Sequence, residues 1–463
     1  QVLAQTIIPG QPLPADPHGP AVRSELASYL TLGVSDPRSF SQTKVSPNFG
    51  PDRVQSWTFG IQREIGKHAA AEVRYVGNRG ENLFQSIDGN PYIAGLASGI
   101  AAGLLNPSLL PAGMTPCSAA DAVVASAVGR ENCDLGKFRE RTNTGYSAYH
   151  GLQTEFRTTN LFNQLTLKTN YTWSKTTDNV SEIFGTGGAG GTYAFSQNPL
   201  NYTSAEHGLS GLDFPNTWTV SFNEALPFFT KQHGVLGHIF GGWSLAGSYI
   251  LQSGEPYTPV QAYLSSSSNP HFWPDGTENP LYNTLDNSFN ASFNTYGFET
   301  ARPFVGNLSA PPTAIGIYAV DACALYGDSV SCGAPANALV DFTALNGTGS
   351  TTVVQGNQVH FIANTNQAQI IAGTPYGNAG RNTLRDYKTN SANFQLAKTS
   401  NLGERVRVIW HMSMVNAFNH PNYSSIDPFL EDAGYVGAYT GFANPTVQNG
   451  GNRTIRFGLK VTF

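Results

Sequence analysis

Charged residues are scarce in this chain, and so are long apolar runs. Only 12% of its 463 residues are charged, against about 25% in an ordinary soluble protein. The formal net charge is -5 and no cluster of lysine and arginine occurs, which excludes the basic surface that binds nucleic acid. No run of about 18 apolar residues exists, so a membrane-spanning helix is excluded. A membrane-spanning β-barrel is not excluded, because each of its strands needs only about ten alternating residues.

Cysteine is limited to four residues, which form two local pairs. Cys117 lies near Cys133, and Cys323 lies near Cys332, each pair in a segment of polar and small residues. This spacing favours two disulfides that close loops in an oxidising compartment, and the alternative is four free thiols. Cys-x-x-Cys is absent, and the histidines form neither H-x-x-x-H nor H-E-x-x-H. We therefore expect no metal ion and no cofactor.

Motifs of known enzymes are lacking as well. The segment "HGLSGL" around Ser210 lacks the second small residue that a nucleophile elbow requires. The glycine-rich segment 185–193 is not followed by Lys-Ser or Lys-Thr, so a flexible extracellular loop explains it better than a phosphate-binding loop. We expect no catalytic residue and no enzyme activity.

Alternating segments are what the sequence does contain. The chain is rich in glycine, tyrosine and phenylalanine, and apolar and polar residues alternate with a period of two, which is typical of β-strands with two different faces. The last segment shows it well, because Ile455, Phe457, Leu459, Val461 and Phe463 share one face. Nine such strands are predicted, at residues 57–65, 71–78, 152–158, 165–175, 216–226, 242–252, 391–398, 404–415 and 452–463.

The connectors between these strands alternate in length. Short connectors follow the first, third, fifth and seventh strands, and long ones follow the second, fourth, sixth and eighth. Every long connector therefore falls at one end of the sheet. A soluble β-sandwich has no reason to segregate its loops in this way, whereas an outer-membrane barrel has short periplasmic turns and long extracellular loops. The predicted fold is thus all-β, a transmembrane antiparallel β-barrel. Residues 1–50 form an extracellular loop or linker before the first clear strand, and residues 51–463 form the barrel.

Strand direction adds a further expectation. If the short turns are periplasmic, the ninth strand runs inward and Phe463 ends in the periplasm, while the first strand begins outside the cell. Nine is also an odd number, whereas bacterial single-chain barrels have even numbers of strands. We expect this chain to be the C-terminal part of a longer barrel.

Several phrases, in this order along residues 47–463, resemble one family. They are "VQSWTFGIQREI", "VRYVGNRGENL", "GYSAYHGLQTEFRT", "NYTWSKTTDN", "GGWSLAGSYILQSGEPYT", "GNAGRNTLRDY", "VNAFNHPNY" and "RTIRFGLKVTF". The chain is similar to the C-terminal portion of the Oar-like TonB-dependent outer-membrane receptors of Acidobacteria and Myxobacteria.

The resemblance implies a 22-stranded barrel around a plug, of which this chain supplies about 9–12 strands. It implies TonB as a partner, through a plug and TonB box that are not present in this chain, and the bacterial cell outer membrane as the location. Outer-membrane lipid, the barrel assembly machinery and an unknown solute are the other implied partners. Phe463 resembles the terminal aromatic residue that the assembly machinery recognises.

Two sets of residues are candidates for binding. Phe272, Trp273 and Tyr282 lie in one long connector, where they are placed to stack on sugar rings or aromatic ligands, or else to pack on one another within the loop. The second set faces the lumen and attracts anionic solutes, although charged lumen walls are ordinary in barrels; it comprises Arg405, Arg407, His411 and Arg456.

The predicted function is uptake of a bulky solute by a TonB-dependent receptor. A surface adhesion or structural protein without transport is the first alternative. A secreted all-β protein that binds carbohydrate is the second.

Overall fold

The computed structural model describes most of the chain: residues 38, 42–161, 164–181, 196–263, 289, 299–403, 405–434, 442–443, 445–448 and 452–463. Within these residues, the nine predicted strands are confirmed and pair as one antiparallel meander in chain order. They are β2 (Arg53–Ile65), β3 (Ala69–Asp88), β4 (Phe138–Leu161), β5 (Leu165–Asp178), β7 (Asn216–Ala225), β8 (Trp243–Gln252), β18 (Thr389–Leu402), β19 (Val406–Val415) and β22 (Thr454–Thr462).

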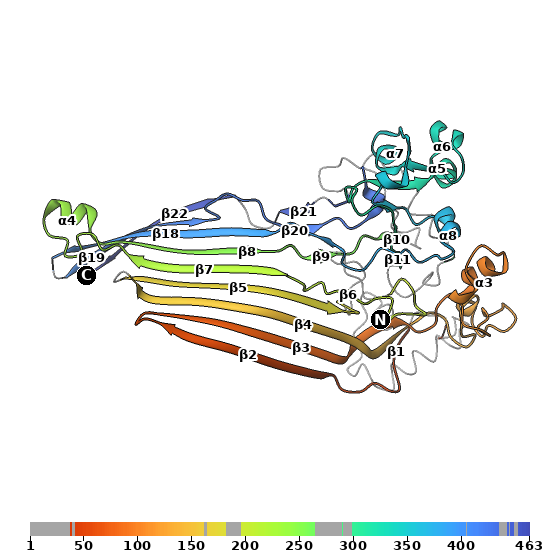
Figure 1. Ribbon diagram of the computed structural model, residues 1–463, viewed down its shortest axis with the longest axis horizontal. Coiled ribbons are helices and arrows are strands. Elements are labelled where there is room, and N and C mark those ends of the chain that lie inside the picture. The colour runs from red at the N-terminus through yellow and green to blue at the C-terminus, as the bar shows by residue number, and fades with distance from the viewer. Residues whose placement is uncertain are drawn as a thin grey trace, which may run out of the picture.

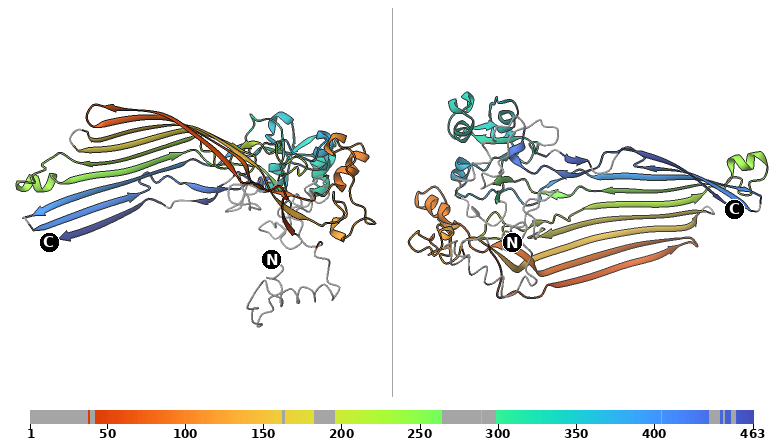
Figure 2. Two further views of the ribbon diagram at one scale, coloured as in Figure 1. Left: turned by 90° about the horizontal axis from the view of Figure 1, so that it is seen from below. Right: turned by 180° about the vertical axis from the view of Figure 1, so that it is seen from behind.

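The ends of this sheet differ as the connector lengths predict (Figure 1). The turns after β2, β4, β7 and β18 lie at one end, here called the short-turn end, together with the C-terminus. The described parts of the connectors after β3, β5, β8 and β19 gather at the opposite end, the long-loop end. The sheet is a single curved layer (Figure 2). In the described residues its pairing path starts at β2 and stops at β22, so the nine strands do not close on themselves.

Two strands extend much further than the alternation predicts. β3 and β4 pair from Ala69↔Thr158 as far as Asp88↔Arg139, with register shifts between Gly80 and Gln85. Beyond Gly80 both faces of these strands carry polar residues. The alternation of apolar and polar residues therefore does not reveal this part of the strands, although their backbone pairing continues. A short strand, β1 (Gln42–Val45), pairs in parallel with this extension of β4, and β6 (Gly208–Leu209) pairs with the end of β5.

The connector between β8 and β18 holds a small α/β unit that the sequence reasoning did not predict. Its mixed sheet consists, in spatial order, of β12 (Phe304–Val305), β16 (Phe361–Ile362), β13 (Ile315–Tyr318), β14 (Leu339–Asp341) and β15 (Val353–Val354). Four helices accompany it, which are α5 (Ala319–Tyr326), α6 (Ser329–Gly333), α7 (Phe342–Thr348) and α8 (Asn366–Ala372). Fully buried apolar residues such as Ile317, Phe342 and Phe361 form its core.

This core also joins connectors that are distant in sequence. Leu430, the first residue of the 3-10 helix η6 (Leu430–Asp432) of the last connector, and Ala433, which follows this helix, are buried in the same cluster as Phe342. Three two-stranded ladders lie nearby: β9 (Pro256–Tyr257) with β17 (Leu384–Arg385), β10 (Gln261–Tyr263) with β11 (Glu299–Ala301), and β20 (Tyr423–Ile426) with β21 (Pro445–Gln448).

A second apolar cluster belongs to the first long connector. Helix α3 (Ala94–Ala101) buries Leu96 with Ile93 and Leu105, and Tyr376 from the third long connector packs against them. We call the described parts of the four long connectors the long-loop assembly. The buried apolar cores of the molecule lie in this assembly and not along the nine-stranded sheet, which places the packed part of the protein at one rim.

Candidate functional site

One face of the nine-stranded sheet is apolar and open. The strand register sets Phe59 opposite Tyr75, Tyr75 opposite Leu152, and so on to Trp410 opposite Leu459, so the alternating apolar residues of neighbouring strands share one face. We call it the apolar face. Its side chains are widely exposed, with Phe59 at 70% and Leu459 at 68%. A soluble monomer rarely exposes an apolar patch larger than a few hundred Å², so this surface is suited to contact with another apolar medium.

Aromatic residues form a band on the apolar face toward the long-loop end. Their polar atoms bond within the sheet: the Tyr75 hydroxyl lies 2.7 Å from His150 Nδ1, and the Tyr171 hydroxyl donates to Asn216 at 2.6 Å. Trp218 donates from its indole nitrogen to Thr169 Oγ1 at 2.9 Å and packs edge-on against Tyr249. Such rings, apolar in body and polar at the tip, are typical of the aromatic girdles that mark the boundary of a bilayer.

The opposite face of the sheet is polar. Arg74 pairs with Glu72 at 3.0 Å on β3, and Lys168 of β5 reaches Glu155 of β4 at 3.2 Å. Arg407 and His411 of β19 and Arg456 of β22 also lie on this face, because Ser413 is opposite Arg456 and His411 is opposite Gly458. Arg405 lies apart from them, in the turn that joins β18 to β19. The structure therefore brings three of the four predicted basic residues together.

The other predicted residues fall in different places. Phe272, Trp273 and Tyr282 lie outside the described residues. Phe463 follows β22 at the short-turn end and is 98% exposed. Among the described residues no group of three or more His, Cys, Asp or Glu side chains is placed to hold a metal ion. No described helix is long and apolar enough to cross a bilayer.

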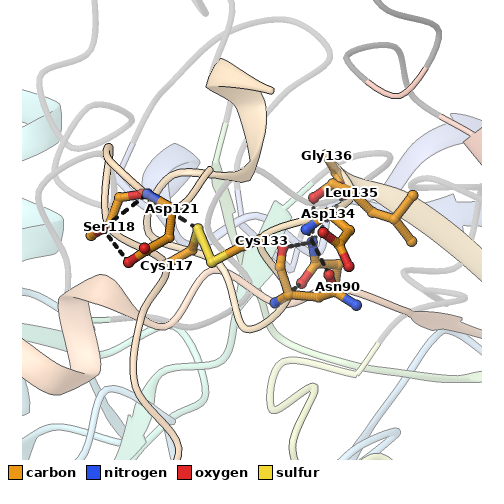
Figure 3. The surroundings of a disulfide bond; sticks show 9 residues. Asn90, Cys117, Ser118, Asp121, Cys133, Asp134, Leu135 and Gly136 are labelled. Atoms are coloured by element: carbon orange, nitrogen blue, oxygen red, sulfur yellow. Dashed lines mark hydrogen bonds between the residues drawn. A yellow bond between two sulfur atoms is a disulfide. The ribbon is translucent and has the colours of Figure 1, made fainter. Parts of the chain in front are cut away.

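Both predicted disulfides are present in the structure. Cys117–Cys133 closes part of the first long connector (Figure 3), and Cys323–Cys332 joins α5 to α6. Beside the first disulfide, the buried Asn90 amide donates to the carbonyls of Leu135 and Gly136 at 2.7 and 3.1 Å. The Cys117–Cys133 disulfide and the Asn90 side chain therefore both hold the same loop in place.

Three ion pairs, two of them buried on both sides, connect segments at the long-loop end of the sheet. Arg302 donates to Glu206 at 2.8 Å, and the two side chains are only 7% and 8% exposed. Arg381 pairs with Asp178 at the end of β5, and Arg385 pairs with Asp213. Breaking such a pair leaves an uncompensated buried charge. The sequence reasoning missed these contacts, although the phrase "GNAGRNTLRDY" contains both Arg381 and Arg385.

Two buried carboxyl groups at the long-loop end are shifted toward their neutral forms. Burial raises the pKa of Asp88 to about 6, against the opposing pull of Arg130. Burial raises the pKa of Asp432 as well, and the neighbouring Asp427 carboxyl adds to that shift. Asp88 is the last residue of β3 and Asp432 lies in η6 of the last connector, so both groups lie at the long-loop end.

One comparison with known proteins, a match to a family model, agrees with this geometry. A family model described as "Outer membrane beta barrel domain" matches residues 5–456. No curated protein is significantly similar in sequence.

Solved structures similar in shape include the outer membrane transporter YddB from Escherichia coli, with 8% identity, a TM-score of 0.36, and coverage of 92% of this chain and 34% of that one. The FrpB iron transporter from Neisseria meningitidis has 10% identity, a TM-score of 0.33 and coverage of 91% and 33%. FpvA of P. aeruginosa, solved with a heterologous pyoverdine and iron, has 8% identity, a TM-score of 0.30 and coverage of 89% and 27%. The chain thus spans about a third or less of the length of these three structures. Because the family model covers nearly all of its length, the chain belongs to the outer membrane beta barrel domain family and is located in the bacterial outer membrane.

Proposed function

We propose that this chain is the C-terminal part of a TonB-dependent receptor that takes up a bulky solute through a plugged barrel. The observation that carries the proposal is an open sheet with two unlike faces. In the described part of the chain β2 and β22 are each paired on one side only, so we infer that further strands close the sheet around a lumen; large outer-membrane barrels of about 22 strands are plugged transporters. The Oar-like character, the 22 strands and the upstream plug and TonB box belong to this proposal.

The parts of the described chain fit distinct roles in such a receptor. The apolar face contacts lipid, and the polar face, with Arg407, His411 and Arg456, lines the lumen and attracts anionic groups. The long-loop assembly surrounds the extracellular mouth, where Phe272, Trp273 and Tyr282 are proposed to contact solute. Phe463 is proposed as the residue that the barrel assembly machinery recognises. No residue is assigned a catalytic role.

The experiment that tests the proposal measures binding between the full-length protein in detergent and the purified periplasmic domain of TonB. Saturable binding, lost when the first residues of the mature full-length protein are deleted, is the expected result. Absence of binding over the concentration range in which a known TonB-dependent receptor binds would overturn the transport proposal. The family membership and the membrane location would survive that result.

A surface adhesion or structural protein is the second candidate. The folded, disulfide-braced α/β unit with a buried core favours it, because transport does not require a loop to contribute to such a core. A secreted carbohydrate-binding protein fits poorly with the open apolar face. Cell-to-cell aggregation that is lost when residues 301–384 are deleted, in the absence of TonB binding, would favour adhesion.

A further inference from the structure

The connection between β7 and β8 is unlike the other turns of the short-turn end. It spans residues 226–242, here called the α4 turn, and contains helix α4 (Gly234–Phe240), which projects beside the C-terminal end of the sheet (Figure 1). Six of its apolar side chains face outward and are more than half exposed: Phe228, Phe229, Val235, Leu236, Ile239 and Phe240. Its ionisable residues are Lys231, His233 and His238, and it contains no aspartate or glutamate.

These apolar side chains are held outward by a fixed backbone. The buried Gln232 amide donates to the Thr399 carbonyl at 2.8 Å and accepts from the Asn401 amide at 3.2 Å, so it clamps the turn to β18. Gly242 has a φ of 74°, and a Cβ at this position would lie 2.2 Å from the Thr399 carbonyl oxygen. The close approach of the two backbones therefore requires glycine at position 242. Helix α4 is thus exposed although the turn that carries it is held against β18.

An open groove of about 520 Å³ runs between the α4 turn and the apolar face. It is lined by Leu226, Phe228, Phe229, Phe240, Trp243 and Leu396, none of which is polar apart from the indole nitrogen. That nitrogen donates to the Ile239 carbonyl at 3.0 Å and is therefore already satisfied. A purely apolar lining of this size suits a hydrocarbon chain better than a polar ligand.

Trp243 separates this groove from a second one of about 310 Å³, which includes Lys398 and Trp410. The Lys398 ammonium lies 5.3 Å from the centre of the Trp243 ring and donates to the Gly241 carbonyl. A lysine whose carbon chain follows an apolar wall while its charge lies at the rim is suited to an anionic group at a bilayer surface.

We infer that the α4 turn is an interfacial anchor and that its groove binds an acyl chain of a phospholipid from the periplasmic leaflet. The inference rests on the outer-membrane location and on the periplasmic position of short turns. An apolar helix side with basic and no acidic neighbours is typical of segments that lie in the headgroup boundary of a bilayer. Lys231 and Lys398 face the phosphate in this arrangement.

The position in the sheet favours lipid over a protein partner. β7, β8 and β18 are each paired on both sides, so strands added at β2 or β22 do not reach the groove. The groove is continuous with the apolar face, since Leu396 of β18 and Trp243 of β8 belong to both. A soluble partner would have to displace lipid from a surface that is already in contact with the membrane.

Spin labels test the anchor in the full-length protein, reconstituted in vesicles of phosphatidylethanolamine and phosphatidylglycerol. The cysteines of the described chain are all in disulfides, so one added cysteine takes one label. Leu236→Cys and Ile239→Cys probe the helix, His233→Cys is the matched control in the same turn, and Phe457→Cys marks the apolar face. Labels at 236 and 239 are expected to collide with oxygen more often than the label at 233, and several-fold less often with a water-soluble nickel complex than the label at 233.

The possible results distinguish a failure of the proposed anchor from a failure of the membrane assignment of the sheet. If the labels at 236 and 239 meet the nickel complex as the label at 233 does, while the label at 457 does not, the anchor is wrong and the membrane-facing sheet stands. If the label at 457 also meets nickel, the membrane assignment fails and the anchor fails with it.

The groove has a readout of its own. The emission of Trp243 is obtained as the difference between the fluorescence of the parent protein and that of its Trp243→Phe variant. Phosphatidylcholine brominated along its acyl chains is expected to quench this emission. A difference that resists quenching would overturn acyl-chain binding even if the helix lies in the interface.

Discussion

Arginine placed at Leu396 is expected to destabilise the membrane-inserted protein far more than arginine placed at Gln395. The two positions are adjacent on β18 and point to opposite faces. Leu396 lies on the apolar face between Leu245 and Met412, whereas Gln395 lies on the polar face between Ala246 and Ser413, which leave room for a long side chain.

The depth of Leu396 follows from the strand geometry. It lies six residues before Leu402, the last residue of β18 at the short-turn end. At about 3.3 Å per residue this is about 20 Å along the strand, and a tilt of about 40° reduces it to about 15 Å of depth. The apolar band of an outer-membrane barrel is about 25 Å tall, so Leu396 lies close to its middle. Arginine facing lipid at that depth costs about 2–4 kcal/mol, which is about a 30- to 1,000-fold change in the folding equilibrium.

The assay is reversible folding of the full-length protein into lipid vesicles from urea, followed by tryptophan fluorescence. Leu396→Arg is expected to reduce the free energy of unfolding by about 2–4 kcal/mol, and Gln395→Arg to reduce it by no more than about 0.5 kcal/mol, as at ordinary solvated positions. Equal losses at the two positions, or a larger loss at Gln395, would refute the assignment of faces.

Three further predictions concern residues at the long-loop end. Arg302→Ala leaves the Glu206 carboxylate buried without its partner, so we expect about 3–5 kcal/mol of local destabilisation; hydrogen exchange should quicken in the assembly and stay unchanged in the sheet. Burial raises the pKa of Asp88 from 3.8 to about 6, so the folded state binds the proton more tightly than the unfolded state. Stability contributed by this group is full below about pH 4 and lost as the pH rises through about 6, and Asp88→Asn should abolish that trend in exchange measured from pH 4 to pH 7. Replacing both Cys117 and Cys133 by serine removes a bond that spans 16 residues and should cost about 3 kcal/mol in the same exchange experiment; protection equal to that of the parent protein would show that the bond is dispensable.

The strands of the sheet were predictable because each one separates two media. Where one face meets lipid and the other water, apolar and polar residues must alternate, as in Leu165–Trp173, and the alternation is visible without any tertiary information. The order of the strands and the two unlike ends followed from connector length. The same argument explains why the extensions of β3 and β4 were missed, since no face of them is reserved for an apolar medium.

The long-loop assembly was not predictable for a different reason. Its helices have only five to eight residues, which is too short for a helical period to stand out. Its ion pairs join residues that are far apart in the chain, such as Arg381 and Asp178 at a separation of 203. Local sequence carries no sign of such partners. The sequence of the α4 turn did indicate an apolar environment, because six apolar residues in a short connector would be unfavourable if they were exposed to water.

A cysteine scan along β5 tests the central claim most directly. Single cysteines are introduced at each position from 165 to 174 in the full-length protein, spin-labelled, and measured in lipid vesicles for collision with oxygen and with a water-soluble nickel complex. We predict a period of two, with labels at odd positions meeting oxygen and not nickel, and labels at even positions showing the reverse preference. Accessibility to nickel at both odd and even positions, or no alternation along the strand, would contradict the assignment of the apolar face to lipid.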